Sequence, residues 1–100
     1  MWSRQLPVSE GMIADYCRRN RIQSLSLFGS VLRPDFRPDS DVDVLVEFHP
    51  GTAVGMLALS RMQRELGQLL GRPVDLVPKA GLKPLVRESV LAVAESVYAA

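Results

Sequence analysis

The stretch from Val42 to Phe48 constrains the fold more than any other part of this 100-residue chain. Its residues are mostly β-branched or aromatic and nearly all apolar, which is the pattern of a buried β-strand. An acidic residue, Asp43, occupies the second position of this stretch, and Asp41 lies two positions before it. Because side chains two apart in a strand project from the same face, we expect the two carboxylates to lie close together.

Apolar residues recur at helical or strand spacing before this strand. Ser9 fits the N-cap of a helix that runs through about Arg19, and Leu25 to Phe28 fit a short strand that ends at Gly29-Ser30. The residues expected on the apolar face of the helix are Met12, Ile13, Tyr16 and Cys17. The segment 31–40 is rich in Pro, Asp and Arg and is therefore expected to be mostly loop.

After Pro50-Gly51 the pattern predicts a helix from about Ala53 to Leu70 with Gly71 as its C-cap, a strand over 74–77 and a last helix over about 82–98. The residues expected at helical spacing in the first of these helices are Gly55, Leu59, Met62, Leu66 and Leu69. Those expected on the apolar face of the last helix are Leu85, Val86, Val90, Val93, Ala94 and Val97. This order of elements indicates a single domain, residues 1–100, of the α+β or α/β class, with helices packed on a small central sheet.

The acidic pair is the strongest indication of chemistry. Two carboxylates as close as those of Asp41 and Asp43 repel each other and raise each other's pKa unless a cation lies between them. Mg²⁺ takes hard oxygen ligands and often bridges one or two carboxylates to substrate phosphates. The alternative is that Asp39, Ser40 and Asp41 are turn-forming residues of the loop, which does not account for an acid inside the strand at Asp43.

Two further features extend this candidate site. Gly29-Ser30 lies one strand upstream of the acidic pair, and such a turn lets backbone N–H groups and a hydroxyl approach a phosphate. Asp75 lies in an apolar strand where a lone acid costs free energy. If that strand lies beside the one that carries Asp43, the carboxylates can share a face, and Asp75 could ligate a metal and act as a general base. The competing interpretation of Asp75 is an edge-strand acid that points at solvent.

The composition excludes several other classes of function. A net charge of +1 provides no basic field for duplex nucleic acid. The lone cysteine, Cys17, cannot form an internal disulfide and suits a reducing compartment. No apolar h-region of a signal peptide is found at the N-terminus, and no apolar run approaches the roughly 20 residues that cross a bilayer. A soluble cytoplasmic protein is therefore expected, without a membrane association.

The stretch from Phe28 to Phe48 resembles the signature of the polymerase-β-like nucleotidyltransferase superfamily: Gly-Ser, a basic loop, then Ser-Asp-x-Asp before an apolar strand. The chain is similar to the minimal branch found in antitoxins of HEPN/MNT toxin–antitoxin systems. That resemblance implies the polymerase-β-like fold, with a small mixed sheet and flanking helices. It also implies that Gly29, Ser30 and Ser40 belong to the nucleotide-binding segment and that Arg33 and Arg37 can neutralise triphosphate charge.

The resemblance further implies two Mg²⁺ ions bound by Asp41, Asp43 and Asp75, with ATP as the substrate. The reaction would be transfer of AMP to a protein hydroxyl, a Tyr of a HEPN ribonuclease toxin, since so short a chain leaves little room for an acceptor-binding domain. Two departures from the family pattern, Val31 and Pro34, favour an alternative. In that alternative the chain is a catalytically weak or inactive antitoxin that neutralises its toxin by direct binding. A small-molecule nucleotidyltransferase would need an added substrate domain.

Overall fold

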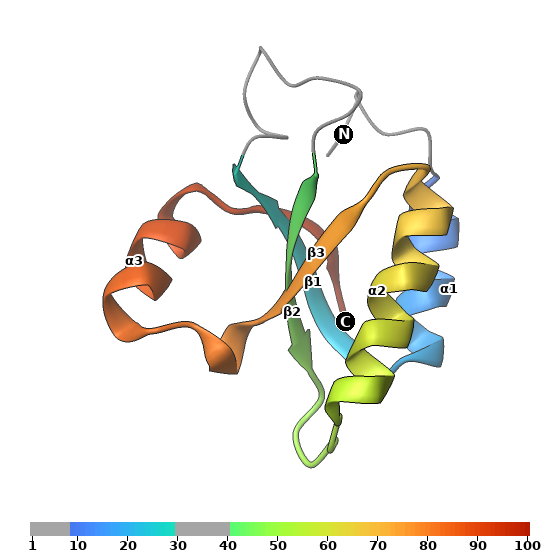
Figure 1. Cartoon of the computed structure of the whole chain (residues 1–100), viewed down its shortest axis with the longest axis horizontal. Helices are drawn as coiled ribbons and strands as arrows, with labels where there is room; N and C mark the ends of the chain where they lie inside the picture. The colour runs from blue at the N-terminus through green and yellow to red at the C-terminus, as the bar shows by residue number, and fades with distance from the viewer. Residues whose placement is uncertain (1–8, 30–40) are drawn as a thin grey trace.

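The computed structural model describes residues 9–29 and 41–100, which form helices and strands (Figure 1). In chain order they are α1 (Glu10–Arg19), β1 (Ile22–Phe28), β2 (Val42–Phe48), α2 (Met56–Leu70), β3 (Val74–Pro78), a 3₁₀ turn (Lys79–Gly81), α3 (Pro84–Val93) and β4 (Glu95–Ala99). The α+β class expected from the sequence is confirmed, and the bounds of β2 are those that its β-branched run predicts.

The four strands form one mixed sheet in the order β3-β2-β1-β4. β2 pairs parallel with β3 and antiparallel with β1, and β1 pairs antiparallel with β4. β2 therefore has a hydrogen-bonded neighbour on each side, which explains why its apolar run is nearly continuous. Val42, Val44 and Val46 are fully buried on one face, and Leu45 is 4% exposed on the other.

One face of the sheet is covered by α1 and α2, which lie side by side in Figure 1. The core between this face and the two helices contains Ile13, Tyr16, Cys17, Ile22, Leu25, Leu27, Val42, Val44, Val46, Met62, Leu66, Leu70, Val74 and Leu76. The Tyr16 hydroxyl donates a hydrogen bond of 2.9 Å to the main-chain carbonyl oxygen of Met62 and so links α1 to α2 inside the core. Burial raises the pKa of this phenol and favours its neutral, hydrogen-bonding form.

The predicted caps are confirmed, and two details of the helices differ from expectation. The Ser9 hydroxyl accepts the amide of Met12, and Gly71 adopts the left-handed conformation of a C-cap. However, Met12 is 49% exposed, because the buried positions of α1 follow an i, i+3, i+4 pattern that begins one residue later. Helix α2 begins at Met56, with Gly55 in an extended conformation as its N-cap, and not near residue 53.

The prediction of a single C-terminal helix over 82–98 was wrong. Helix α3 ends at Val93, Ala94 is extended, and the last residues form β4 against the edge of β1. The amide of Ala100 donates to the carbonyl oxygen of Gln23 at 2.8 Å and continues this pairing. A helical pattern in the sequence is outweighed here by an unpaired strand edge, whose main-chain groups β4 satisfies. No helix in the described part of the chain is long and apolar enough to cross a membrane.

Candidate active site

The acidic pair lies where β2 begins. Asp41 directly precedes the strand and is exposed, whereas Asp43 is half-buried between the fully buried Val42 and Val44. Since side chains alternate along a strand and the two valines face the helices, Asp43 projects from the opposite face of the sheet. This face is the one that α1 and α2 leave uncovered.

Asp75 is brought to the same place by β3. β2 and β3 run parallel, and Asp43 and Asp75 are direct partners in their register. Partners on neighbouring strands project to the same side of a sheet, so the two carboxylates share a face. The predicted adjacency of the two strands is therefore confirmed. Asp75 is also an exposed residue on an edge strand, so both interpretations offered for it describe part of its environment.

The electrostatics of the site follow from this arrangement. The pKa of the Asp43 carboxyl is raised from its ordinary value, first by burial, then by the negative charge of Asp75 and last by that of Asp41. The sequence predicted the repulsion between Asp41 and Asp43. It did not predict that burial and the neighbour across the strands would contribute more, because both effects depend on which strand lies beside β2.

Gly29 has a role that the sequence did not reveal. It follows the last residue of β1, Phe28, whose register partner on β2 is Asp43. Gly29 has a φ of 77°, and a Cβ atom at this position would overlap the Asp43 carboxylate and lie 3.1 Å from its Cγ. A glycine is thus needed here for the left-handed backbone and for the space that the carboxylate occupies. The other predicted members of the loop, Ser30, Arg33, Arg37 and Ser40, lie outside the described residues.

The carboxylates provide the hard oxygen donors that Mg²⁺ prefers. Within residues 9–29 and 41–100, no three Asp, Glu, His or Cys side chains are arranged so as to surround a metal ion. Asp43 and Asp75 are nevertheless neighbours on adjacent strands, and burial together with the charges of Asp75 and Asp41 raises the pKa of Asp43, so a cation bound beside it would stabilise the carboxylate. Asp41 and Asp75 are exposed, so their side chains have room to adopt other rotamers. The donor set therefore fits a divalent cation.

Comparison with known families gives this geometry its context. Residues 11–94 match the model of the nucleotidyltransferase domain, which spans most of the chain. The chain belongs to the nucleotidyltransferase domain family. Its strands β1, β2 and β3 all lie inside the matched region, with Gly29, the acidic pair and Asp75 in or directly beside them.

Individual relatives of this nucleotidyltransferase agree with the assignment. It is 37% identical over 70 residues to the protein adenylyltransferase MntA of Thermococcus cleftensis, a match that covers 70% of this chain and 69% of the relative. Among solved structures, it is similar to a chain of a toxin–antitoxin complex with AMP-PNP, with a TM-score of 0.76 and 22% identity over 93% of this chain and 75% of that chain.

A second solved structure contains a tri-AMPylated HEPN toxin of Shewanella oneidensis in complex with an MNT antitoxin. The nucleotidyltransferase matches one chain of it with a TM-score of 0.66 and 22% identity over 91% of this chain and 70% of that chain. At this level of identity the two solved structures establish the fold. They confirm that the four-stranded sheet with its helices is a nucleotidyltransferase fold.

Proposed function

We propose that this nucleotidyltransferase is a Mg²⁺-dependent protein adenylyltransferase that transfers AMP from ATP to a hydroxyl group of a partner protein. The observation that carries the proposal is the register match of Asp43 with Asp75, which puts two carboxylates on one face of the sheet beside Gly29. Family membership provides the reaction class, and the MntA relative provides the expectation of AMP as the transferred group.

Each residue of the site has a distinct task in this reaction. Asp41 and Asp43 would hold the cations, with Asp75 as the third carboxylate ligand. Mg²⁺ ions bound there supply positive charge for the triphosphate and for the attacking oxygen. The Gly29 backbone and the side chains of the 30–40 segment, namely Ser30, Arg33, Arg37 and Ser40, would bind the phosphates.

The transfer is an in-line displacement at the α-phosphorus of ATP. The acceptor oxygen forms a bond to this phosphorus, the bond between the α-phosphorus and the bridging oxygen breaks, and pyrophosphate leaves. The proton of the acceptor hydroxyl passes to the Asp75 carboxylate, whose exposure lets an acceptor approach it from the edge of the sheet.

The partner protein is a HEPN-domain toxin, and the acceptor is a Tyr hydroxyl. A solved relative contains a tri-AMPylated HEPN toxin bound to its MNT antitoxin, which makes such a toxin the first candidate acceptor. In this assignment the chain acts as an antitoxin, because AMP on the toxin would add charge and bulk to it.

The decisive assay uses ATP labelled at the α-phosphate, Mg²⁺ and the cognate HEPN-domain protein. We expect the wild-type chain to label the acceptor and Asp43→Asn to lower the rate by about 100-fold, because loss of one ligand displaces the reacting groups. Asp15→Asn is the matched control. Asp15 is an exposed carboxylate of α1, pairs with Arg19 and is not part of the candidate site.

Three outcomes would contradict the proposal. The first is unchanged labelling by Asp43→Asn. The second is transfer of label from γ-labelled ATP, which would indicate phosphotransfer. The third is neutralisation of the toxin by wild type and by Asp43→Asn alike with no label on the toxin, which would identify a module that acts by binding alone.

A further inference from the structure

Helix α3 stands apart from the rest of the fold. It spans ten residues, Pro84–Val93, and none of them is buried. Figure 1 shows α3 on the opposite side of the sheet from α1 and α2. An isolated helix shorter than about 12–15 residues is marginal in water, and most helical stability in proteins comes from packing of an apolar face. α3 therefore has the properties of a helix that packs against another molecule.

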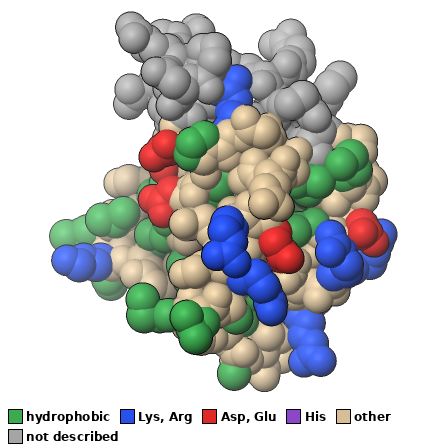
Figure 2. Space-filling view, turned by 45° about the vertical axis from the view of Figure 1, so that its right-hand side comes forward, with side chains coloured by type: hydrophobic (Ala, Val, Ile, Leu, Met, Phe, Trp, Pro, Cys, Tyr) green, Lys and Arg blue, Asp and Glu red, His purple; other side chains and the backbone are tan. Residues whose placement is uncertain are grey.

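The exposed side chains of α3 are unusually apolar for a solvated helix. They are Leu85, 87% exposed, Val93, 61% exposed, Val86, 49% exposed, and Leu91, 43% exposed. Figure 2 shows hydrophobic side chains gathered on the left of the molecule, the side on which α3 lies in Figure 1. Single exposed apolar residues are common on proteins, but four large ones within ten residues indicate an interaction surface.

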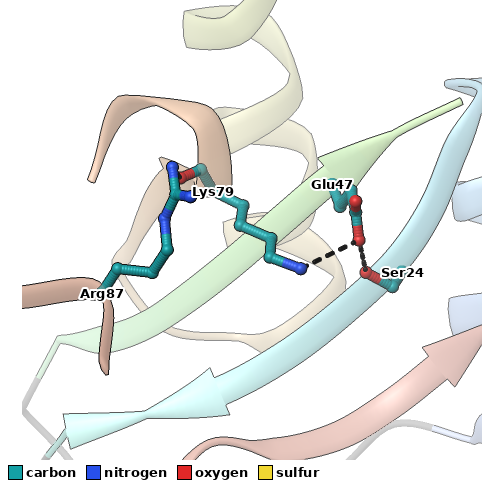
Figure 3. Close-up of polar contacts among 4 residues, drawn as sticks. All are labelled: Ser24, Glu47, Lys79 and Arg87. Atoms are coloured by element: carbon teal, nitrogen blue, oxygen red, sulfur yellow. Dashed lines mark hydrogen bonds and ion pairs between the residues drawn. The ribbon is translucent and has the colours of Figure 1, made fainter. Parts of the chain in front are cut away.

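A cavity of about 510 Å³ lies beside α3, at the carboxyl ends of β2 and β3. Two basic side chains, Lys79 and Arg87, line it together with Glu47. The Lys79 Nζ lies 3.5 Å from the Glu47 Oε1, which also accepts the Ser24 hydroxyl at 3.2 Å (Figure 3). The charge of Lys79 is therefore paired with a carboxylate of the chain itself, in a partly exposed ion pair.

Arg87 is different. Its Nη2 makes a long contact of 3.5 Å with the carbonyl oxygen of Lys79, and its buried Nε has no hydrogen-bond partner among the described residues. A buried donor without an acceptor costs free energy. Arg87 lines the cavity, so its flexible side chain can rotate into the cavity to reach an acceptor there. The Nε–Nη2 edge of a guanidinium matches the two oxygens of a carboxylate. A carboxylate that enters the cavity could therefore pair with Arg87, next to the exposed apolar side chains of α3.

The position of this surface relates it to the reaction. Glu47 lies four residues along β2 from Asp43, and side chains at even separations share a face, so the cavity and the carboxylates open on the same side of the sheet. At the rise of a strand this separation is about 13 Å. A protein that covers α3 and fills the cavity would therefore lie across the face that carries Asp43 and Asp75.

We propose that α3 and the Arg87 cavity form the docking surface for the acceptor protein, which presents an acidic side chain to Arg87 and an apolar patch to Leu85 and its neighbours. Two observations favour an acidic partner. The charge of Lys79 is compensated by Glu47, whereas Arg87 has no carboxylate partner among the described residues and Lys83 adds a second cation at the start of the helix. The proposal rests on the proposed function in one respect, namely that the acceptor is a protein.

The test measures binding of the HEPN-domain protein to the chain by calorimetry, without nucleotide. Leu85→Ser should weaken binding about tenfold or more, since burial of a leucine is worth at least that much. Leu57→Ser is the matched control, because Leu57 is 90% exposed on α2 and should change the affinity less than twofold. Val93→Ser provides a second variant of α3, and thermal unfolding of each variant checks that the fold is intact.

A second pair of variants tests the cavity. Arg87→Lys keeps the charge but loses the bidentate edge, and we expect it to weaken binding about tenfold. Arg64→Lys, on the exposed surface of α2, should have no effect. Asp43→Asn should bind as wild type does, because Asp43 lies outside α3 and the cavity. If wild type binds the HEPN-domain protein but transfers no label to it, the proposed function is contradicted and the docking surface stands.

Several results would overturn the docking surface. These are no binding of the HEPN-domain protein to wild type, wild-type affinity in Leu85→Ser and Arg87→Lys, or equal weakening by Leu57→Ser and Leu85→Ser. Self-association of the chain in sedimentation, abolished by Leu85→Ser, would show instead that a second copy covers α3.

Discussion

Replacement of Gly29 by alanine separates the two tasks that the structure gives to this residue. The backbone at Gly29 has a φ of 77°, which disfavours any side chain by about 1–2 kcal/mol. A Cβ atom there also overlaps the Asp43 carboxylate, which must turn to another rotamer at a cost of about 0.5–1.5 kcal/mol. We therefore expect Gly29→Ala to lower the free energy of unfolding by about 1.5–3.5 kcal/mol.

The effect on the reaction should be much larger than the effect on stability. Turning the Asp43 carboxylate moves its oxygens by roughly 1 Å or more, and a displacement of this size can reduce a rate by about 100-fold. Gly51→Ala is the matched control. Gly51 has a φ of 82° with nothing within 4 Å of the added Cβ, so this variant carries the backbone strain without the overlap.

The assays are urea unfolding for stability and label transfer from ATP for activity. Gly51→Ala should lose about 1–2 kcal/mol of stability and keep wild-type activity at temperatures where it is folded. In an Asp43→Ala background, the stability cost of Gly29→Ala should fall to that of Gly51→Ala, because the overlapping carboxylate is gone. The reasoning is refuted if Gly29→Ala transfers AMP at the wild-type rate, or if its cost is the same with and without the Asp43 carboxylate.

Two other predictions concern pH and the edge of the sheet. The pKa of Asp43 is raised in the folded state, so the contribution of this carboxyl to stability is present below its ordinary pKa near 3.8 and is lost as the pH rises through the raised value. Without metal, Asp43→Asn should therefore unfold at a higher temperature than wild type at pH 7 but not at pH 3, and calorimetry that shows no such pH-dependent difference would contradict the raised pKa. The side-chain oxygen of Gln63 accepts the amide of Leu76 at 2.9 Å, so Gln63→Leu should cost about 1 kcal/mol and speed hydrogen exchange at Leu76, whereas Gln68→Leu, exposed on the same helix, should do neither.

The elements that the sequence predicted well are those whose stability is decided locally. The run from Val42 to Phe48 is mostly apolar and rich in β-branched residues because β2 is paired on both sides. Its bounds could therefore be predicted from the local residue pattern. The caps at Ser9 and Gly71 depend on one side chain or one glycine, and they too were predictable.

The C-terminal strand could not be predicted in the same way. The segment after Val93 continues the apolar helical pattern, and only the presence of β1 with an unpaired edge makes β4 favourable. Such pairing links residues far apart in the chain, and a local pattern does not report it. The sequence also predicted that the apolar side chains of α3 pack on the sheet. They are exposed instead, and a local pattern cannot show whether an apolar helix face has a packing partner within the chain.

In the candidate site too, the residues could be predicted from the sequence, whereas their contacts could not. The Asp41–Asp43 pair was evident from its spacing, and Asp75 from an acid in an apolar strand. That Asp43 and Asp75 are register partners depends on the parallel pairing of β2 and β3. The contact of Gly29 with Asp43 and the unpaired Nε of Arg87 both depend on tertiary geometry, and neither had a signal in the sequence.

The central claim is that Asp43 and Asp75 hold a divalent cation on one face of the sheet. Crystals of the chain grown with Mn²⁺ and a non-hydrolysable ATP analogue, measured near the manganese absorption edge, test it most directly. The account predicts an anomalous difference peak within bonding distance of the Asp43 carboxylate, with Asp75 or Asp41 as a further ligand, and no peak in Asp43→Asn. A bound nucleotide whose phosphates lie away from Asp43, with no anomalous peak beside it, would contradict the account.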